Sequence, residues 1–198
     1  MTKHDEGYIK FNLSWEEKDF DFNDKDFLQI NSYRNKFYKL GLIGAYPDGI
    51  GFGNISIRNN KNEFIISGSA TGNFKNLTKK HYSLVKDYNI HKNSVLCEGL
   101  NKVSSESLTH ATIYETNLDV NTVIHIHHET MWSRYLDDLP TTDKKAEFGT
   151  PEIAMEIKKL ANQDSGIIIM GGHREGIIAY GKSLFEAEEI ILNYFNKL

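Results

Sequence analysis

The segment Val123–His128 places two histidines two residues apart within a run rich in β-branched residues. In a β-strand alternate side chains lie on the same face, so His125 and His127 are expected to point the same way. Two imidazoles about 7 Å apart at their roots can bind one metal ion. Two exposed histidines on a half-buried strand would have the same spacing. The pair alone therefore leaves both interpretations open.

A third histidine follows the apolar run 167–169, in the loop Met170-Gly-Gly-His-Arg-Glu-Gly176. Catalytic zinc usually takes three ligands from the protein, which makes His173 a candidate ligand, although a lone loop histidine is more often a surface residue. His110 is expected to be a satisfied, partly buried histidine that supports the site. His128 is expected to face away from the pair or to begin the next element.

The segment Ser104-Ser105-Glu106 is predicted to begin a helix. A helix start presents unpaired backbone N–H groups and the positive end of the helix dipole, and two hydroxyls beside it suit a phosphate or carboxylate. An ordinary N-cap with an acidic first turn would have the same sequence. His110 lies four residues after Glu106 and is expected to share its helix face.

Two loops carry glycines next to polar side chains. In Gly51-Phe-Gly-Asn-Ile-Ser56, the glycines allow close approach to a ligand and the Asn54 amide can donate to it. In 67–72, backbone N–H groups with Ser69 and Thr71 can form an anion-binding concavity. A glycine turn and a solvated loop are the alternatives. Neither loop matches the glycine patterns of ATP or NAD sites.

The elements that must position these residues alternate between helices and short strands. Helical spacing predicts helices over 26–40 with Gly41 as the C-cap, over 104–115, over 150–160 and from Ser183 to the end. Strands are predicted at 54–58 and 64–66 as a hairpin, and near 84–85, 94–97, 122–128, 167–169 and 177–179. This order predicts an α/β domain with a mixed or largely antiparallel sheet flanked by helices.

Composition narrows the class of protein. The chain has 198 residues, 39% hydrophobic and 12% aromatic, which suits one packed domain. A formal net charge of -4 gives no electrostatic case for nucleic-acid binding. The single cysteine, Cys97, lies in an apolar run and is expected to be buried and reduced. With no apolar run of about 20 residues and a polar start, a cytoplasmic protein without a membrane partner is expected.

Six of these segments, taken in order, resemble the class II aldolase/adducin family, which includes fuculose-phosphate aldolase and ribulose-phosphate 4-epimerase. The matching stretches are 53–56, the loop ending at Gly72 with Leu77-Thr78, Ser104-Ser-Glu-Ser-Leu-Thr-His110, 123–127, Gly149-Thr-Pro-Glu152, and Gly172-His173 with Gly176 and Gly181-Lys182-Ser183. The resemblance implies a three-layer α/β/α single domain at 25–198 with a mixed, largely antiparallel central sheet, after an N-terminal arm at 1–24. It also implies a homotetramer with active sites between neighbouring subunits.

The resemblance also assigns residues. The family's metal ligands fall on His125, His127 and His173, and its catalytic glutamate, which can also occupy a metal position, falls on Glu106. Its phosphate-binding positions fall on Asn54, Thr71, Gly72, Ser104 and Ser105.

The activity implied is that of a carbon–carbon lyase acting on a small phosphorylated ketose, or in reverse on an aldehyde. A divalent metal would chelate the ketose oxygens and stabilise the enediolate, while Glu106 takes or returns the carbon-bound proton. Zinc is the first expectation, although three imidazoles also suit manganese, iron or cobalt. The alternatives are a sugar-phosphate 4-epimerase, a methylthioribulose-phosphate-type dehydratase, and a non-catalytic adducin-like binding module.

Two departures from the family pattern bear on the reaction. The stretch between His127 and Gly149 is shorter than in the sugar-phosphate aldolases, where it supplies a proton-donating tyrosine, and its only tyrosine here is Tyr135. In addition, Arg174 and Glu175 separate His173 from Gly176, where the family more often has His-Gly. These two residues are expected beside the metal, where they can alter substrate choice.

Overall fold

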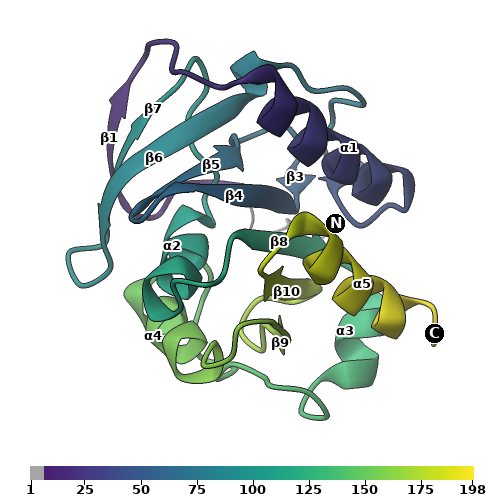
Figure 1. Ribbon diagram of the computed structural model, residues 1–198. Helices are drawn as coiled ribbons and strands as arrows, with labels where there is room; N and C mark the ends of the chain where they lie inside the picture. Colours follow the sequence, from purple (N-terminus) through teal and green to yellow (C-terminus); the bar gives the residue numbers. More distant parts are fainter. Residues whose placement is uncertain (1–6) are drawn as a thin grey trace.

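An eight-stranded sheet crosses the molecule in this computed structural model, which describes residues 7–198 (Figure 1). In spatial order the strands are β1 (Asn12–Glu16), β7 (Ser94–Glu98), β6 (Tyr82–Asn89), β5 (Glu63–Ser67), β4 (Asn54–Asn60), β8 (Thr122–His127), β10 (Gly176–Gly181) and β9 (Gly166–Ile169). Among these strands only β1 and β7 pair in parallel, which confirms the prediction of a mixed, largely antiparallel sheet.

Helices cover both faces of the sheet. One face packs against α2 (Ser107–Thr116) and α4 (Pro151–Leu160), and the other against α1 (Asp24–Lys39), α3 (Glu129–Tyr135) and α5 (Leu184–Phe195). Each face has its own hydrophobic cluster, and β8 contributes to both, with Val123 in one and Ile124 and Ile126 in the other. The predicted three-layer α/β/α arrangement is therefore confirmed.

The helix ends follow the capping signals closely. Asn23, Thr150 and Ser183 accept backbone N–H bonds at the starts of α1, α4 and α5. The C-cap of α1 is Leu40 rather than Gly41, and Gly41 follows it in the left-handed region at φ 72°. The helix predicted from residue 104 begins at Ser107.

Several short elements were not predicted: β1, α3, a 3-10 turn at Lys79–His81, and a two-stranded ribbon of β2 (Gly44–Ala45) and β3 (Gly51–Phe52). β1 alternates exposed and half-buried residues and is defined by pairing with β7, some 80 positions later. Residues 1–6 of the predicted arm lie outside the described residues. The division into an arm at 1–24 and a domain at 25–198 stays a prediction.

The centre of the sheet positions the site. β8 is flanked by β4 and β10, both antiparallel to it, with Asn54 opposite His125 and Gly176 opposite His127. The end of β8, the beginning of β4 and the loop before β10 therefore meet at the same end of these central strands. His125 and His127 share a face of β8 with Val123, which packs in the hydrophobic cluster on the α2 side of the sheet.

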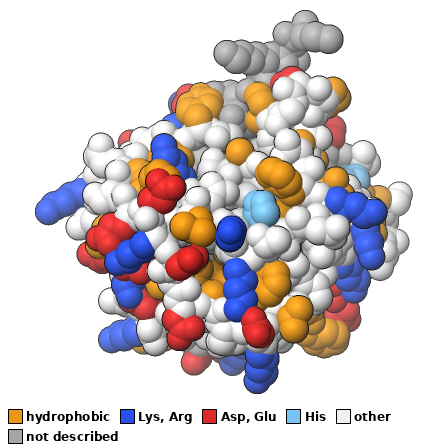
Figure 2. Space-filling model, turned by 90° about the horizontal axis from the view of Figure 1, so that it is seen from above, with side chains coloured by type: hydrophobic (Ala, Val, Ile, Leu, Met, Phe, Trp, Pro, Cys, Tyr) orange, Lys and Arg blue, Asp and Glu red, His pale blue; other side chains and the backbone are white. Residues whose placement is uncertain are grey.

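The surface shows no dominant sign of charge on the face drawn in Figure 2, where Lys and Arg side chains are interspersed with Asp and Glu. Among residues 7–198, no helix is both long enough and apolar enough to cross a membrane. Cys97 is buried, as expected, and this burial raises the pKa of its thiol to about 11.

Candidate active site and metal centre

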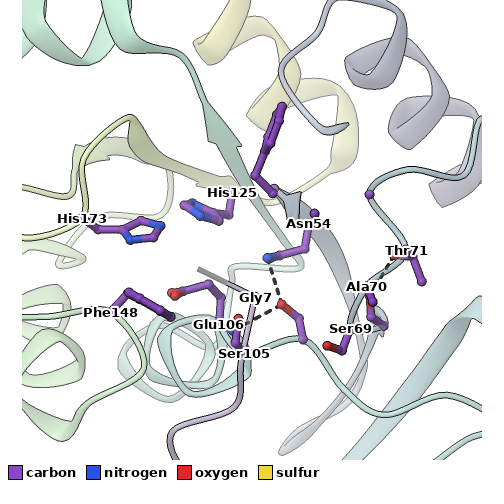
Figure 3. Close-up of a pocket in the computed structure, with 16 residues that line it drawn as sticks. Gly7, Asn54, Ser69, Ala70, Thr71, Ser105, Glu106, His125, Phe148 and His173 are labelled. Atoms are coloured by element: carbon purple, nitrogen blue, oxygen red, sulfur yellow. Dashed lines mark hydrogen bonds between the residues drawn. The ribbon is translucent and has the colours of Figure 1, made fainter. Parts of the chain in front are cut away.

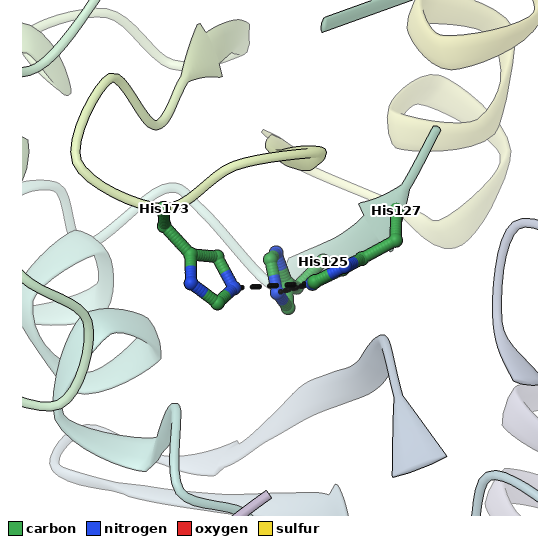
Figure 4. Close-up of side chains that lie close together, drawn as sticks. All are labelled: His125, His127 and His173. Atoms are coloured by element: carbon green, nitrogen blue, oxygen red, sulfur yellow. Dashed lines mark hydrogen bonds between the residues drawn. The ribbon is translucent and has the colours of Figure 1, made fainter. Parts of the chain in front are cut away.

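Three buried imidazoles converge at the end of β8 (Figure 4). His125 and His127 project from the same face of β8, and His173 reaches them from the loop between β9 and β10. The Nε2 atom of His127 lies 3.0 Å from Nε2 of His125 and 3.1 Å from Nε2 of His173. Nitrogen ligands at 2.0–2.1 Å from a tetrahedral ion lie about 3.3 Å apart. The spacing of the three rings therefore fits a single metal ion.

The opposite ring nitrogens of the β8 pair are anchored by the protein. Nδ1 of His125 lies 3.2 Å from the carbonyl oxygen of Ile177, and Nδ1 of His127 lies 2.9 Å from the hydroxyl of Tyr46. Such bonds fix the ring orientation and direct the Nε2 lone pairs toward the cluster. Burial, with the neighbouring His173 and His110, holds the pKa of His125 well below its usual range. His125 is thus neutral, the form that binds metals.

A pocket opens next to this cluster and contains a buried carboxylate (Figure 3). Glu106 lies immediately before α2 and is 3% exposed. One of its oxygens, Oε2, accepts a hydrogen bond of 2.7 Å from the hydroxyl of Thr109. In Figure 3, Glu106 lies between His125 and His173 on one side and the polar residues on the other. A carboxylate held there can exchange a proton with a ligand that bridges the two ends.

The polar end of the pocket is built around Asn54 and Ser104. The Asn54 amide nitrogen donates to the Ser104 hydroxyl oxygen at 3.0 Å, and the backbone N–H of Glu106 donates to the same oxygen at 3.2 Å. Asn54 is buried, and its Oδ1 has no hydrogen-bond partner among the described residues. A buried polar atom without a partner is costly, so this oxygen is suited to accept a hydrogen bond from a donor on a ligand.

The loop 68–72 closes the same end. Its residues Ser69, Ala70, Thr71 and Gly72 all line the pocket, and Ala70 adopts the left-handed region at φ 57°. The Thr71 hydroxyl donates to the carbonyl of Gly68 at 2.8 Å, which tightens the loop. Gly72 has no space for a side chain, because a Cβ there would lie 1.9 Å from the carbonyl oxygen of Gly44. Backbone N–H groups in such a loop can form an anion-binding concavity.

The structure thus brings the predicted site residues together. Eight of them line one pocket: Asn54, Thr71, Gly72, Ser104, Ser105, Glu106, His125 and His173. His127 lies outside the pocket wall but belongs to the imidazole cluster. Glu106 does not belong to that cluster. The roles of these residues stay predictions.

The two other histidines are placed by the structure in different ways. His128 is the N-cap of α3, where its Nδ1 accepts from the backbone N–H of Met131, so it begins the next element as expected. His110 is fully buried rather than partly buried. Its Nδ1 lies 2.7 Å from the Ser56 hydroxyl, but its Nε2 has no partner among the described residues, so it is only partly satisfied. Burial lowers the pKa of His110 to about 3.

Sequence reasoning missed several residues around the site. Phe148 and Gly7 line the pocket, and Tyr46 contacts His127 from the turn between β2 and β3. The sequence Tyr46-Pro-Asp-Gly49 signals this turn, but no local pattern shows what the tyrosine contacts. Tyr135 lies on α3 in the opposite hydrophobic layer, where its hydroxyl donates to the carbonyl of Tyr194 at 3.3 Å.

Comparison with known proteins identifies the family of this chain and the fold that it shares. The family described as the class II aldolase and adducin N-terminal domain matches residues 36–194. Similar solved structures include an L-fuculose 1-phosphate aldolase, with 20% identity, a TM-score of 0.68, and coverage of 89% of this chain and 84% of the other. The sugar-phosphate aldolase from Thermotoga maritima has 16% identity, a TM-score of 0.60, and coverage of 83% and 88%. No curated protein matches the sequence. At these identities the structures establish a shared fold.

Proposed function

The chain belongs to the class II aldolase and adducin family, and on this basis we propose that it is a divalent-metal-dependent carbon–carbon lyase acting on a small phosphorylated ketose. The observation that supports this proposal is a single pocket lined at one end by two of the three clustered imidazoles and at the other by a polar loop, with the buried carboxylate of Glu106 between them. A small substrate with oxygens at one end and an anion at the other fits this order of groups.

In the proposed site, His125, His127 and His173 hold the metal ion, for which zinc is the first candidate. A bound divalent ion supplies Lewis-acid polarisation of substrate oxygens. The three rings are buried and already lie close together, two on β8 and one on the loop before β10, so little reorganisation is needed on binding. An imidazole set also favours zinc-like ions over calcium or magnesium, which prefer oxygen ligands.

Glu106 is the proposed acid–base residue. Its carboxylate removes the proton from the reacting carbon or returns it there. The hydrogen bond from Thr109 holds Oε2 in place, which restricts the side chain to one orientation in the pocket. A fixed base next to the reacting carbon contributes through position as well as through proton affinity.

Asn54, Thr71, Gly72, Ser104 and Ser105 are the proposed phosphate-binding residues. Hydroxyl, amide and backbone N–H groups there can surround an anion, and the start of α2 adds a favourable dipole. Anchoring the phosphate fixes the distance of the rest of the substrate from Glu106 and the histidines. The tight contact between Gly72 and Gly44 keeps this end of the pocket in place.

The metal is tested first, by mass spectrometry of the untagged protein after purification. We expect close to one divalent ion per chain, removable by a chelator and restored by added zinc. Protein that neither carries metal nor takes up zinc would contradict the enzyme proposal. A non-catalytic binding module of the adducin type would then take its place.

The reaction is tested next with Glu106→Gln and a panel of phosphorylated ketoses. Loss of a catalytic base is expected to reduce kcat by about 10²–10⁴-fold while metal content is retained. Glu188→Gln is the matched control, since Glu188 is also a buried glutamate but lies on α5 and pairs with Lys36. Release of an aldehyde fragment identifies the lyase. A 4-epimer or a dehydrated product would instead identify the two alternative reactions, and normal turnover by Glu106→Gln would contradict the assigned role.

We also propose that the chain forms a homotetramer in the cytoplasm, built from the domain at 25–198 with the arm at 1–24. Light scattering of the purified protein measures the assembly directly. A monomer with full activity would contradict a site shared between subunits.

A further inference from the structure

The hydroxyl of Tyr46 lies between His127 and Glu175. Its oxygen is 2.9 Å from Nδ1 of His127 and 2.8 Å from Oε2 of Glu175, while those two atoms are 4.0 Å from each other. The tyrosine therefore bridges a carboxylate to one of the three clustered imidazoles. Glu175 is one of the two residues that separate His173 from Gly176, so the bridge uses a feature in which this sequence departs from the family pattern.

The chemistry of the three groups sets the direction of both hydrogen bonds. An ionised carboxylate only accepts, so the single hydroxyl proton of Tyr46 goes to Glu175. The tyrosine oxygen is then an acceptor for His127, whose Nδ1 must carry the proton. A neutral imidazole protonated on Nδ1 has its lone pair on Nε2, and Nε2 is the atom that points into the cluster.

The fold holds the tyrosine in place by a tight turn and a ring contact. Tyr46 begins the turn that connects β2 to β3, and the Gly49 N–H donates to its carbonyl at 2.8 Å. Pro47 and Gly49 suit the second and fourth positions of such a turn. The tyrosine ring also lies 4.6 Å from that of Phe52, centroid to centroid.

Glu175 is held from two sides. Arg174 makes two 2.9 Å hydrogen bonds to the carboxylate of Glu129 on α3, and the backbone carbonyl of Glu175 accepts from the N–H of His128 at 3.0 Å. Glu175 itself adopts a left-handed backbone conformation at φ 69°, which is uncommon for a residue other than glycine. Backbone strain of this kind persists where the surroundings enforce it, and it concentrates at functional sites.

We propose that Tyr46 and Glu175 are positioning residues that keep His127 protonated on Nδ1 and thereby raise the metal affinity of the three-histidine site. This inference rests on the proposed metal site and assigns to the Arg174-Glu175 pair a part in it. Glu175 acts through Tyr46, because the hydroxyl lies between the carboxylate and the ring. Loss of a group that orients a metal-binding histidine typically weakens the metal by 10–100-fold.

Zinc affinity of Tyr46→Phe, Glu175→Ala and the double variant tests this, by competition with a chromophoric chelator. Tyr46→Phe keeps the ring and removes the hydroxyl, and we expect zinc binding weaker by about 10–100-fold. The double variant is expected to bind as Tyr46→Phe does, because without the hydroxyl the carboxylate is 4.0 Å from Nδ1 of His127, beyond hydrogen-bond distance. Tyr135→Phe is the matched control: it removes a hydrogen-bonded hydroxyl in the opposite layer, and zinc affinity should be unchanged.

Long-range ¹H–¹⁵N NMR of the imidazoles gives a second readout on metal-free protein. Wild-type His127 is expected to be protonated on Nδ1, and Tyr46→Phe to show a mixture of tautomers. Unchanged zinc affinity in Tyr46→Phe, an additive double variant, or His127 protonated on Nε2 in the wild type would each overturn the inference and leave the metal site standing. Failure of the wild type to bind zinc would instead overturn the proposed function, and with it the effect on affinity.

Discussion

His173 keeps its place because the residue that starts β10 has no side chain. A Cβ on Gly176 would lie 2.2 Å from Cδ2 of His173 and 3.0 Å from its carbonyl oxygen. The first distance is far below any van der Waals contact, and the ring belongs to a buried side chain with little room to move. The glycine is therefore required by the close approach of the imidazole rather than by its own φ.

Gly176→Ala should displace the His173 ring, so that the metal site loses one of its three imidazoles. We expect zinc affinity to fall by at least 10-fold, with a circular dichroism spectrum like that of the wild type. The control is Gly41→Ala, where a Cβ meets nothing within 4 Å but the backbone lies at φ 72°. That variant should lose about 1 kcal/mol of stability and no zinc affinity. Equal zinc affinity in Gly176→Ala and wild type would contradict the steric argument.

Some of the site residues could be predicted from the sequence, and others could not. The alternation in β8 is enough to place His125 and His127 on one face, because strand geometry has a strict period of two. His173 was a candidate because catalytic zinc usually takes three protein ligands, but only the fold brings this residue close to β8. Tyr46 had no local signal for its role, since its contact with His127 spans 81 positions. Contacts of this kind depend on how distant strands pair.

At the scale of elements, one helix holds the loop that lines the pocket. Arg34 on α1 is 1% exposed, and its guanidinium donates to the carbonyls of Thr71, Gly72 and Lys75 at 3.0, 3.3 and 3.1 Å. Burial lowers the pKa of Arg34, but a guanidinium stays protonated in proteins. These bonds hold the loop against α1, on the side away from the pocket. The positive charge of Arg34 therefore lies close to the proposed anion site.

Arg34→Met should loosen this loop and weaken anion binding. Three carbonyls lose their donor, two of them in buried hydrogen bonds, so we expect a loss of about 3 kcal/mol in unfolding free energy and faster hydrogen exchange at residues 71–75. The KM for a phosphorylated substrate, or the Kd for inorganic phosphate, should rise about 10-fold with metal content unchanged.

A second arginine provides the control for this prediction. Arg58 on β4 also donates to backbone carbonyls. These are the carbonyls of Lys61, Tyr114, Asn117 and Val120. Its guanidinium lies 4.7 Å from an aromatic ring centroid, as that of Arg34 does. It does not line the pocket. Arg58→Met should destabilise the protein similarly and leave phosphate binding unchanged. Equal loss of phosphate binding in both variants would show a general effect of stability.

The longer elements were predictable because each carries its own signal: helical spacing with a cap in α1, α4 and α5, and turn residues between β4 and β5. The short ones were not. α3 has seven residues and two buried side chains, too few for a period to show. β1 exists as a strand through its parallel partner β7, which sequence patterns do not reveal.

Across the whole molecule, two imidazoles are buried where a helix packs against the sheet: His110 on α2 and His125 on β8. His110 has no exposed surface, packs under the site beside Ser56, and has a pKa lowered to about 3 by burial. The pKa of His125 is lowered in the same direction. In the unfolded chain these groups take up a proton near their ordinary pKa of 6.5. Below that pH the unfolded state therefore binds more protons than the folded state. Because of this difference, the free energy of unfolding decreases as the pH falls.

His110→Asn should remove part of this pH dependence in metal-free protein. Above pH 6.5 the histidine is neutral in both states and has no effect. Between pH 6.5 and 3 only the unfolded state binds the proton, so stability falls as the pH falls, by about 1.4 kcal/mol per unit. From pH 7 to about pH 5, urea unfolding should show the wild type losing about 2 kcal/mol more than the variant. The amide introduced by the substitution can keep a hydrogen bond to Ser56, and the smaller side chain lowers stability equally at both pH values. An equal decrease in unfolding free energy in the two proteins would mean that His110 is protonated in the folded state as well. The imidazole would then not be protected from protonation by its burial.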